Sequence, residues 1–308
     1  MQLAGFRDIR SKEELQKAAD LANDLKNEKV LVDILAHNNV SLSQIDSHPY
    51  TIQTWYKKYQ KCIRCTGLKN CAQDTSGYFD NIVDDGFLHT EKCACKYMRQ
   101  RLSERKHLEN FLINDMPEKL FTVQFTGIQV EKENNAYWKV LAECMAACNG
   151  GSGVYLYGTM GSGKTYLAAC ACNQFARNGK KVAFIHYPTF AQRIAGKVET
   201  GEYRSEVQKL MYASFVVMDD IGAESVTEWN RDTILLPILN ARYEKGLPTW
   251  FTSNEDFTTL QEHFTFTKKG KIEEVKALRI MERMRSMAKP IALLGESRRQ
   301  YLSRTPEE

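Results

Sequence analysis

The sequence predicts an α/β protein in which a parallel β-sheet flanked by helices follows a small, largely helical domain. Two observations predict this division. Five of the nine cysteines lie between residues 62 and 95, and beyond residue 110 short apolar runs alternate with helical patterns. Strands that alternate with helices form a parallel sheet covered on both faces. We place the boundary at about residue 110, which gives domains of residues 1–110 and 111–308.

The N-terminal domain begins with a helix start signal. Ser11 and Glu14 form a capping box, in which each side chain bonds to the other residue's backbone N–H group. The apolar residues that follow repeat with helical spacing: Leu15, Ala18, Ala19, Ala22 and Leu25. A basic helical stretch at residues 99–107 and the residues 114–117 (Asn-Asp-Met-Pro) indicate a linker before the second domain.

The second domain is predicted from apolar runs that are bounded by turn residues. Asn178-Gly179 and Gly246 are typical helix stops, and each is followed by another apolar run. The predicted helices are residues 164–177 and 229–243, and the predicted strands are residues 154–157, 182–185, 215–218 and 249–252.

The loop after the first of these strands carries a phosphate-binding motif. Its glycines allow φ > 0, so that backbone N–H groups turn toward phosphate oxygens, and the following helix N-terminus adds its positive dipole. Lys164 would reach the β and γ phosphates of ATP, and the Thr165 hydroxyl would bind Mg²⁺. The loop consists of Gly158, Thr159, Met160, Gly161, Ser162, Gly163, Lys164 and Thr165.

Two later strands end in polar residues that suit ATP hydrolysis. The strand at residues 215–218 is followed by Asp219, which would hold Mg²⁺ through water, and Asp220, which would orient the attacking water. The strand at residues 249–252 is followed by Asn254, placed to sense the γ-phosphate. A strand end or a turn explains either pattern alone, but a phosphate loop earlier in the chain favours the catalytic interpretation.

Two arginines complete the predicted site. Arg242 lies at the end of a helix, where it could reach the nucleotide of a neighbouring subunit, and Arg283 lies in the run Ile-Met-Glu-Arg-Met-Arg at residues 280–285. A planar guanidinium binds phosphate oxygens in pairs. Surface arginines are usually only solvated, so neither pattern is specific alone.

The cysteine cluster predicts a structural zinc site. Cys62 and Cys65 have the two-residue spacing of a zinc knuckle, and their polar surroundings do not suit inert buried thiols. The predicted ligands are Cys62, Cys65, Cys93 and Cys71, with Cys95 or His89 as alternatives to Cys71. Four ligands close a tetrahedron, so the metal would hold the fold rather than catalyse.

Composition excludes some classes of protein. No apolar run approaches the roughly 18 residues of a membrane span, and the N-terminus becomes charged before a signal-peptide core could form. We therefore expect a soluble cytoplasmic protein without membrane contact, whose cysteines are thiols or metal ligands. The formal charge of +4 says little about nucleic acid.

Several segments together resemble the AAA+ helicase loaders of the DnaC/DnaI family. They are the phosphate loop and residues 219–224, 247–254 and 280–285. Residues 61–71, with the pattern Lys-Cys-x-x-Cys-x-Gly-Leu-x-x-Cys, resemble the zinc-bearing N-terminal domain of the DnaI-type primosomal loaders of Firmicutes and their phages. The resemblance covers most of the chain.

The resemblance implies a AAA+ ATPase domain and a role for each site residue. It implies Walker A at residues 158–165, Walker B at Asp219, sensor 1 at Asn254, a trans arginine finger at Arg242 and sensor 2 at Arg283, with Arg285 as a rival. Many AAA+ proteins carry glutamate where this chain has Asp220. Because the shorter carboxylate positions water less well, we expect slow, switch-like hydrolysis.

The resemblance also implies partners. The N-terminal domain would bind the hexameric replicative helicase, and the AAA+ domain would bind ATP and single-stranded DNA and self-associate. The protein would then deliver the helicase onto single-stranded DNA during replication initiation or restart. Aromatic and basic residues suitable for DNA lie among Phe190, Arg193, Lys197, Tyr203 and Arg204, although interspersed glutamates fit an ordinary solvated helix equally well.

Three other functions compete with the loader. One is an ATPase partner of a transposase, which shares the nucleotide core but does not explain the zinc segment. A second is a P-loop small-molecule kinase, which would need an acceptor site. A third is a zinc-stapled adaptor that binds ATP without hydrolysing it.

Overall fold

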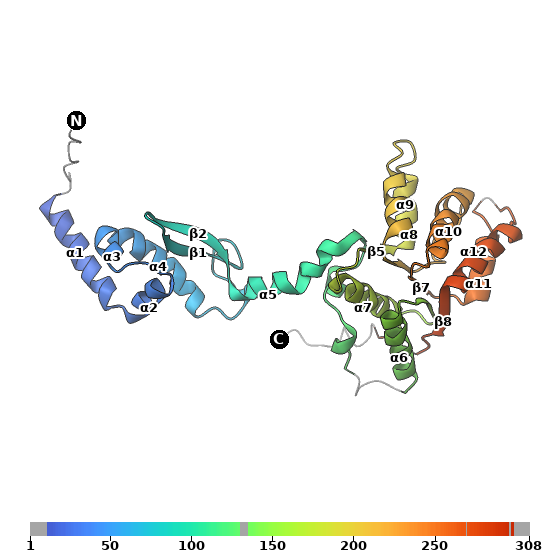
Figure 1. Ribbon diagram of the computed structural model, residues 1–308, viewed down its shortest axis with the longest axis horizontal. Coiled ribbons are helices and arrows are strands. Elements are labelled where there is room, and N and C mark those ends of the chain that lie inside the picture. Colours follow the sequence, from blue (N-terminus) through green and yellow to red (C-terminus); the bar gives the residue numbers. More distant parts are fainter. Residues whose placement is uncertain (1–10, 130–134, 269, 296, 299–308) are drawn as a thin grey trace. The chain divides into compact units, whose positions relative to one another are not determined.

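The computed structural model describes residues 11–129, 135–268, 270–295 and 297–298. The chain divides into two compact units, residues 1–104 and 105–308 (Figure 1). The first ten residues, on which the prediction about a signal peptide partly rested, lie outside the described residues. In the described parts of the chain, no helix is long and apolar enough to cross a membrane.

Four helices form most of the N-terminal unit. They are α1 (Lys12–Asn27), α2 (Lys29–His37), α3 (Ser43–Ser47) and α4 (Pro49–Ile63). The predicted capping box is confirmed, because Glu14 N donates to Ser11 Oγ over 3.2 Å and Ser11 N donates to Glu14 Oε2 over 2.7 Å. The buried core of this unit includes Leu31, Leu35 and Ile52.

The N-terminal unit also contains a β-hairpin that the sequence analysis did not predict. Strands β1 (Tyr78–Asp84) and β2 (Leu88–Ala94) pair antiparallel, between the short η1 helix (Leu68–Asn70) and α5 (Lys96–Arg105). The indole Nε1 of Trp55 on α4 donates to Asp80 O over 2.8 Å and ties the hairpin to the helices. The hairpin carries Cys93, so part of the predicted zinc site lies on a strand.

The second unit is built on a parallel sheet, as predicted; the sheet has six strands, of which β3 and β8 were not predicted. The strand order is β3-β5-β6-β7-β4-β8, in which every neighbouring pair is parallel. Their bounds are β3 (Phe111–Asn114), β4 (Gly153–Tyr157), β5 (Val182–His186), β6 (Phe215–Asp219), β7 (Thr249–Ser253) and β8 (Ala288–Ala292).

Helices cover both faces of this sheet. One core cluster includes apolar residues of α6 (Asn135–Gly150) and α7 (Lys164–Arg177). The other lies under a second set of helices: α8 (Tyr187–Ala195), α9 (Tyr203–Tyr212), α10 (Leu236–Glu244), α11 (Phe257–Thr265) and α12 (Glu274–Met287). Among the described residues of this unit, three short helices precede α6: η2 (Lys106–Asn110), η3 (Glu118–Leu120) and η4 (Phe125–Gly127).

The predicted linker was wrong. Residues 111–114 form the edge strand β3, which pairs with β5, and Met116 is buried in the core. The apolar run Phe111-Leu112-Ile113 explains this, because an edge strand gains backbone bonds and burial there that a solvated linker lacks. The units divide between Glu104 and Arg105.

The helix predicted at residues 229–243 is two elements. A π-helical segment, η6 (Trp229–Leu235), leads directly into α10. Pro237 lies at the junction and has no N–H to donate, so a regular α-helical ladder is interrupted there.

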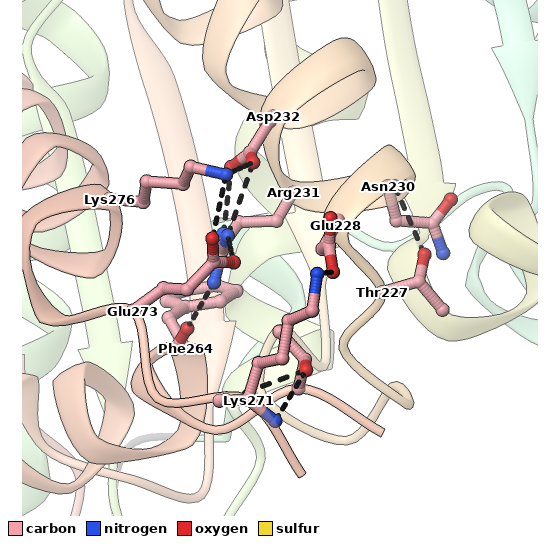
Figure 2. A network of polar contacts seen from close by, with 10 residues as sticks. Thr227, Glu228, Asn230, Arg231, Asp232, Phe264, Lys271, Glu273 and Lys276 are labelled. Carbon is pink, nitrogen blue, oxygen red and sulfur yellow. Dashed lines mark hydrogen bonds and ion pairs between the residues drawn. The ribbon is translucent and has the colours of Figure 1, made fainter. Parts of the chain in front are cut away.

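A buried cation anchors η6 to the neighbouring helices (Figure 2). Arg231 is 1% exposed, donates to Phe264 O over 3.0 Å and pairs with Asp232 at 2.8 Å and with Glu273. Lys276 joins both carboxylates, at 2.8 Å from Asp232 and 2.9 Å from Glu273. The network therefore ties η6 to the end of α11 and the start of α12.

Candidate functional site

The predicted nucleotide residues meet at one edge of the sheet. Strands β6, β7 and β4 are neighbours, and all run in the same direction. The phosphate loop follows β4, Asp219 ends β6, and Asn254 follows β7. Because the carboxyl ends of parallel strands lie at one edge, these three elements, distant in sequence, come together there.

The phosphate loop depends on glycine where its backbone is tightest. Gly158 has φ = 138°, and a Cβ atom there would lie 2.3 Å from Leu293 O, so no other residue fits without displacing the chain after β8. Gly163, with φ = 107°, directly precedes α7. The first N–H groups of α7 therefore face the loop, as in anion sites at helix N-termini.

Lys164 links the loop to the sensor position. Its ammonium group donates to Gly158 O, Thr159 O and Asn254 Oδ1, each over 2.9 Å, and the residue is only 7% exposed. A buried lysine held by three neutral oxygens keeps its charge concentrated at the loop. Phosphate oxygens would be better partners than these, because their bonds to an ammonium are charge-assisted on both sides.

Asp219 is the buried carboxylate of the site. Burial raises its pKa, while hydrogen bonds from Thr252 and Thr165 oppose that rise. The Thr252 hydroxyl donates to Asp219 Oδ1 over 2.6 Å. Carboxylate and hydroxyl oxygens suit Mg²⁺, and a cation there would favour the ionised carboxylate. The chemistry of these ligands therefore fits the predicted metal.

Asp220 is held in an unusual backbone conformation. Its φ is +59°, which is uncommon for a residue with a side chain, and its N–H donates to Thr252 Oγ1 over 2.9 Å. Asn254 Nδ2 donates to Asp220 Oδ1 over 3.3 Å. Such local strain is stored where surrounding bonds enforce it, often at functional sites. Asp220 and Asn254 thus form a pair across two strand ends.

A hollow of about 390 Å³ opens beside the phosphate loop. It brings part of the loop and the sensor asparagine to one solvent-accessible space. The residues that line it are Tyr157, Gly158, Thr159, Met160, Asn254, Glu255, Asp256, Thr259 and Leu294.

The structure does not support Arg242 as a trans arginine finger. Its side chain is 0% exposed and donates to Leu210 O, Ala213 O, Pro248 O and Thr249 Oγ1 over 2.7–2.9 Å. Burial lowers the pKa of Arg242 to about 9, which still leaves the guanidinium charged at pH 7. A finger must reach a neighbour's phosphates, whereas this group joins the end of α9 to the start of β7.

The two arginines of α12 face different neighbours. Arg283 Nε donates to Asn240 Oδ1 over 2.9 Å, and its guanidinium lies 4.9 Å from the Tyr243 ring centre, so it packs against α10. Arg285 instead lies 5.6 Å from the ring of Phe257, three residues after Asn254. None of these contacts is with the phosphate loop or Asn254, so sensor 2 stays a prediction, with Arg283 as its residue and Arg285 as the rival.

The cysteines of the N-terminal unit are half-buried, and two of the sulfurs accept hydrogen bonds. Gln73 Nε2 donates to Cys62 Sγ over 3.1 Å, and Gly77 N donates to Cys71 Sγ over 3.4 Å. Amide donors of this kind stabilise a thiolate. The backbone bond from Gly77 lowers the pKa of Cys71 accordingly.

The charges of three other cysteine sulfurs affect the pKa of Cys62. Burial raises the pKa of Cys62, the bond from Gln73 opposes that rise, and smaller contributions raise it further from Cys65, Cys71 and Cys95. Still, across the described ranges no three or more His, Cys, Asp or Glu side chains form a group that could hold a metal ion. The structure therefore does not show the predicted zinc site.

The predicted ligand Cys93 and the two alternatives to Cys71, Cys95 and His89, are placed differently. Cys93 lies on β2 opposite Phe79, and Cys95 directly follows β2 and bonds through its N–H to Gly77 O over 2.8 Å. The ring of His89 is directed to Phe87 O, at 3.0 Å. Because the backbone of Gly77 bonds both Cys95 and the sulfur of Cys71, these contacts favour Cys95 over Cys93 and His89 as a ligand beside Cys71.

The predicted DNA-contacting stretch is largely used within the protein. Phe190 is fully buried, Arg193 pairs with Asp115 at 3.0 Å and with Glu206 at 3.1 Å, and Lys197 pairs with Glu206 at 2.5 Å. These contacts favour the alternative of an ordinary helical surface for those three residues. Of the remaining two residues, Arg204 lies over the ring of Tyr203, with its guanidinium carbon 6.0 Å from the ring centre.

Sequence reasoning missed two polar residues at this edge. Thr252 bonds both Asp219 and Asp220, and His186 faces Asp220 at 3.8 Å. Each stands at the end of an apolar strand run, as Asp219 does. The signal available in the sequence was that each residue directly follows a predicted strand run: His186 follows residues 182–185, and Thr252 follows residues 249–251.

The fold and this edge define a AAA+ P-loop ATPase. Residues 85–304 match the family described as IstB-like ATP binding protein. The match spans well over half of the chain, and the chain therefore belongs to that family.

Similarity to individual proteins extends beyond the ATPase unit. The chain is 27% identical over 293 residues to the replicative helicase loader DnaI of Bacillus subtilis (strain 168), which covers 94% of this chain and 92% of that one. A crystal structure of DnaI superposes with a TM-score of 0.53 at 28% identity, covering 60% of this chain and 97% of that chain. The resemblance to the DnaC/DnaI family is thus confirmed.

A third similarity is shorter. The chain is 29% identical over 106 residues to the chromosomal replication initiator protein DnaA of Mesoplasma florum (strain ATCC 33453 / NBRC 100688 / NCTC 11704 / L1). That match covers 33% of this chain and 24% of DnaA, so it concerns one segment of each protein.

Proposed function

We propose that the protein is an ATP-dependent loader that binds a hexameric replicative helicase and delivers it onto single-stranded DNA. The observation that carries this function is the similarity to the DnaI loader over 94% of the chain, which includes the N-terminal unit as well as the ATPase. A transposase partner or a small-molecule kinase would share the nucleotide edge alone. Replication initiation or restart is the process in which such a loader acts.

Within this function, residues 158–165 bind the phosphates of ATP, and Lys164 leaves its backbone acceptors for the β and γ phosphates. Thr165 and Asp219 would hold Mg²⁺, which supplies charge neutralisation at the phosphates. Asp220 orients water and Asn254 senses the γ-phosphate. Hydrolysis is slow, because the Asp220 carboxylate is one methylene shorter than the usual glutamate. Arg283 serves as sensor 2 in this proposal, and Arg285 is its rival.

The N-terminal unit would provide the grip on the helicase and bind structural zinc. The spacing of Cys62 and Cys65, the amide donors to Cys62 and Cys71, and the proximity of Cys95 support a four-sulfur site. Cys62, Cys65 and Cys71 would supply three of the ligands, and in this proposal Cys95 replaces the predicted Cys93. Self-association through the AAA+ domain and a location in the cytoplasm belong to the same proposal.

A paired binding and unwinding experiment tests the loader function. The full chain should capture its cognate hexameric helicase and stimulate unwinding on protein-coated single strands that carry a duplex block. The Lys164→Ala variant should still capture the helicase but fail to stimulate unwinding, because the grip does not use the phosphate loop. Capture and stimulation both absent from the native protein would refute the loader function and favour the transposase partner.

A further inference from the structure

Three ionisable side chains from separate elements meet beside the turn that carries Asp220. They are Glu224, four residues after Asp220, Glu255, the residue after Asn254, and His263 on α11. One atom of each is buried without a hydrogen-bond partner among the described residues: Glu224 Oε1, Glu255 Oε2 and His263 Nε2. Buried polar atoms are normally paired, so three such atoms in one place indicate an interaction that joins them.

Glu224 is bonded to the turn itself. Gly222 N donates to Glu224 Oε2 over 2.8 Å, and Ala223 N donates to Asp220 O over 3.3 Å. Gly222 has φ = 97°, and a Cβ atom there would lie 2.9 Å from Leu260 Cδ1 on α11, so the turn packs closely against that helix. The Glu224 carboxylate therefore helps to set the backbone that carries Asp220.

The other oxygen of Glu224 faces His263. His263 Nε2 lies 3.8 Å from Glu224 Oε1, and the two side chains are 23% and 4% exposed. A pair buried to this extent is screened much less by solvent and salt than a pair on the surface. In the described part of the chain, neither Glu224 nor Glu255 forms an ion pair with a lysine or an arginine, so His263 is the cation available to both.

The end of α11 that carries His263 is fixed by other buried contacts. Phe264, the next residue, is 1% exposed, and its carbonyl oxygen accepts a hydrogen bond from Arg231 over 3.0 Å (Figure 2). Arg231 also pairs with Glu273, directly before α12. A bond between Glu224 and His263 would therefore tie the turn to a helix whose own position is set.

We propose that His263 is a positioning residue for ATP hydrolysis: as an imidazolium it pairs with Glu224 and thereby holds the turn that carries Asp220 against α11. The proposal rests on the hydrolytic role of Asp220 in the proposed function. It makes turnover depend on the protonation of a residue that does not contact the nucleotide.

The surroundings of His263 set the sign of this dependence. Burial lowers its pKa, but Glu224 and Glu255 outweigh burial, so the pKa is raised above its ordinary 6.5. Burial raises the pKa of Glu255, and a backbone N–H of α11 lowers that of Asp256 beside it. Tyr187, near Glu224 at the start of α8, has a pKa raised by burial and stays neutral. The pair is therefore complete below about pH 6.5 and is lost as pH rises through the raised pKa of His263.

Steady-state ATP hydrolysis across pH, by variants of the full chain, tests the role. His263→Leu should lower kcat by about 10-fold at pH 6, as for a misplaced catalytic group, with KM for ATP nearly unchanged. The deficit should disappear toward pH 9, where the native imidazole is neutral, whereas a merely structural role would change kcat equally at every pH. Glu224→Gln should reproduce the loss at pH 6. Glu262→Gln, an exposed neighbour of His263 on α11, is the control and should follow the native profile.

A charged replacement should rescue the variant. His263→Lys stays protonated over this range, so it should match the native kcat at pH 6 and exceed it at pH 9. A His263→Lys variant as slow as His263→Leu at pH 6 would overturn the inference.

An NMR titration of the histidine rings gives a readout that does not depend on hydrolysis. The His263 signal, identified by its absence from the His263 variants, should titrate above pH 6.5 in the native chain and at lower pH in Glu224→Gln. The same titration midpoint in both proteins would overturn the pair.

These outcomes separate the inference from the function on which it rests. Native kcat in His263→Leu at pH 6, with turnover lost in Asp220→Asn, would overturn the inference alone. If Asp220→Asn hydrolyses ATP at the native rate, the role of Asp220 fails and the positioning role of His263 fails with it. Should His263→Leu not fold, His263→Lys and Glu224→Gln decide.

Discussion

The nucleotide edge of the ATPase unit and the cysteine cluster of the N-terminal unit were both predicted from sequence motifs, yet they differ in how completely the fold assembles them. At the nucleotide edge, Asn254 already bonds both Lys164 and Asp220. In the cysteine cluster the sulfurs are near, but no metal-binding group forms among the described residues. A sheet places strand ends by backbone pairing alone, whereas a thiol cluster relies on its metal to close.

The largest effect that would sharpen this contrast is the loss of zinc. Cys62→Ser in the full chain should abolish stoichiometric zinc and unfold the N-terminal unit, because closed zinc sites supply folding free energy directly. ATP binding by the second unit should persist. Elemental analysis and a two-transition thermal melt measure both.

The matched controls are Cys95→Ser and Cys93→Ser. The surroundings of Cys62 predict that Cys95→Ser loses zinc and that Cys93→Ser retains it. If the native chain contains no zinc when purified, the proposed zinc site is wrong, and the distinction between the two regions no longer holds.

At the nucleotide edge the largest effect should come from Lys164. Lys164→Ala removes the buried ammonium that joins the loop to Asn254, and we expect ATP binding to fall below detection. Lys180→Ala, an exposed lysine beyond α7, is the control and should bind normally. Calorimetric titration with Mg-ATP gives the answer, and comparable affinity in the two variants would contradict the site.

Asp220→Asn should separate binding from turnover. The amide keeps the shape and the neighbours of the carboxylate but cannot polarise water, so ATP binding should be within about twofold of native while hydrolysis falls by about 100-fold or more. Phosphate release measures turnover.

These two regions also show what the sequence could predict. The strand ends of β4, β6 and β7 follow from short apolar runs that stop at polar residues, and the sheet brings them together. The hairpin of β1 and β2 was missed because its residues are mostly half-exposed, and its apolar and polar residues do not alternate along either strand.

The finger role predicted for Arg242 finds no support in the structure, for a different reason. Its place at a helix end was predicted correctly, but the direction in which its side chain points could not be predicted from the sequence. The guanidinium turns inward to the carbonyl oxygens of Leu210 and Ala213, thirty residues earlier in the chain, and local patterns carry no such information. Thr252 and His186 were overlooked because single polar residues at strand ends are common.

The inward direction of Arg242 makes a stability prediction. Arg242→Met leaves three buried carbonyl oxygens without their donor, and each unsatisfied group costs about 1–3 kcal/mol, so unfolding should be easier by about 3 kcal/mol or more. Arg283→Met, on the half-buried face of α12, should cost less than about 1 kcal/mol. Urea denaturation compares them. Equal stabilities, with Arg242→Met defective only in ATP turnover, would restore the finger assignment.

The smallest expected signal is the reactivity of the four thiols in the ATPase core. Cys144, Cys148, Cys170 and Cys172 are fully or almost fully buried, and burial raises the pKa of Cys144 and Cys148 to about 12. At pH 8 about one such thiol in 10,000 is then ionised, against roughly a quarter at the unperturbed pKa, so native alkylation should leave them unmodified. The half-buried N-terminal cysteines should react once a chelator is added, because a bound metal would otherwise protect them. Mass spectrometry after iodoacetamide treatment, with and without chelator, locates the label. Modification of the four core cysteines at the same rate as Cys62 would show that the second unit opens as readily as the first. The contrast between a nucleotide edge assembled by its sheet and a cysteine cluster that needs its metal would then be lost.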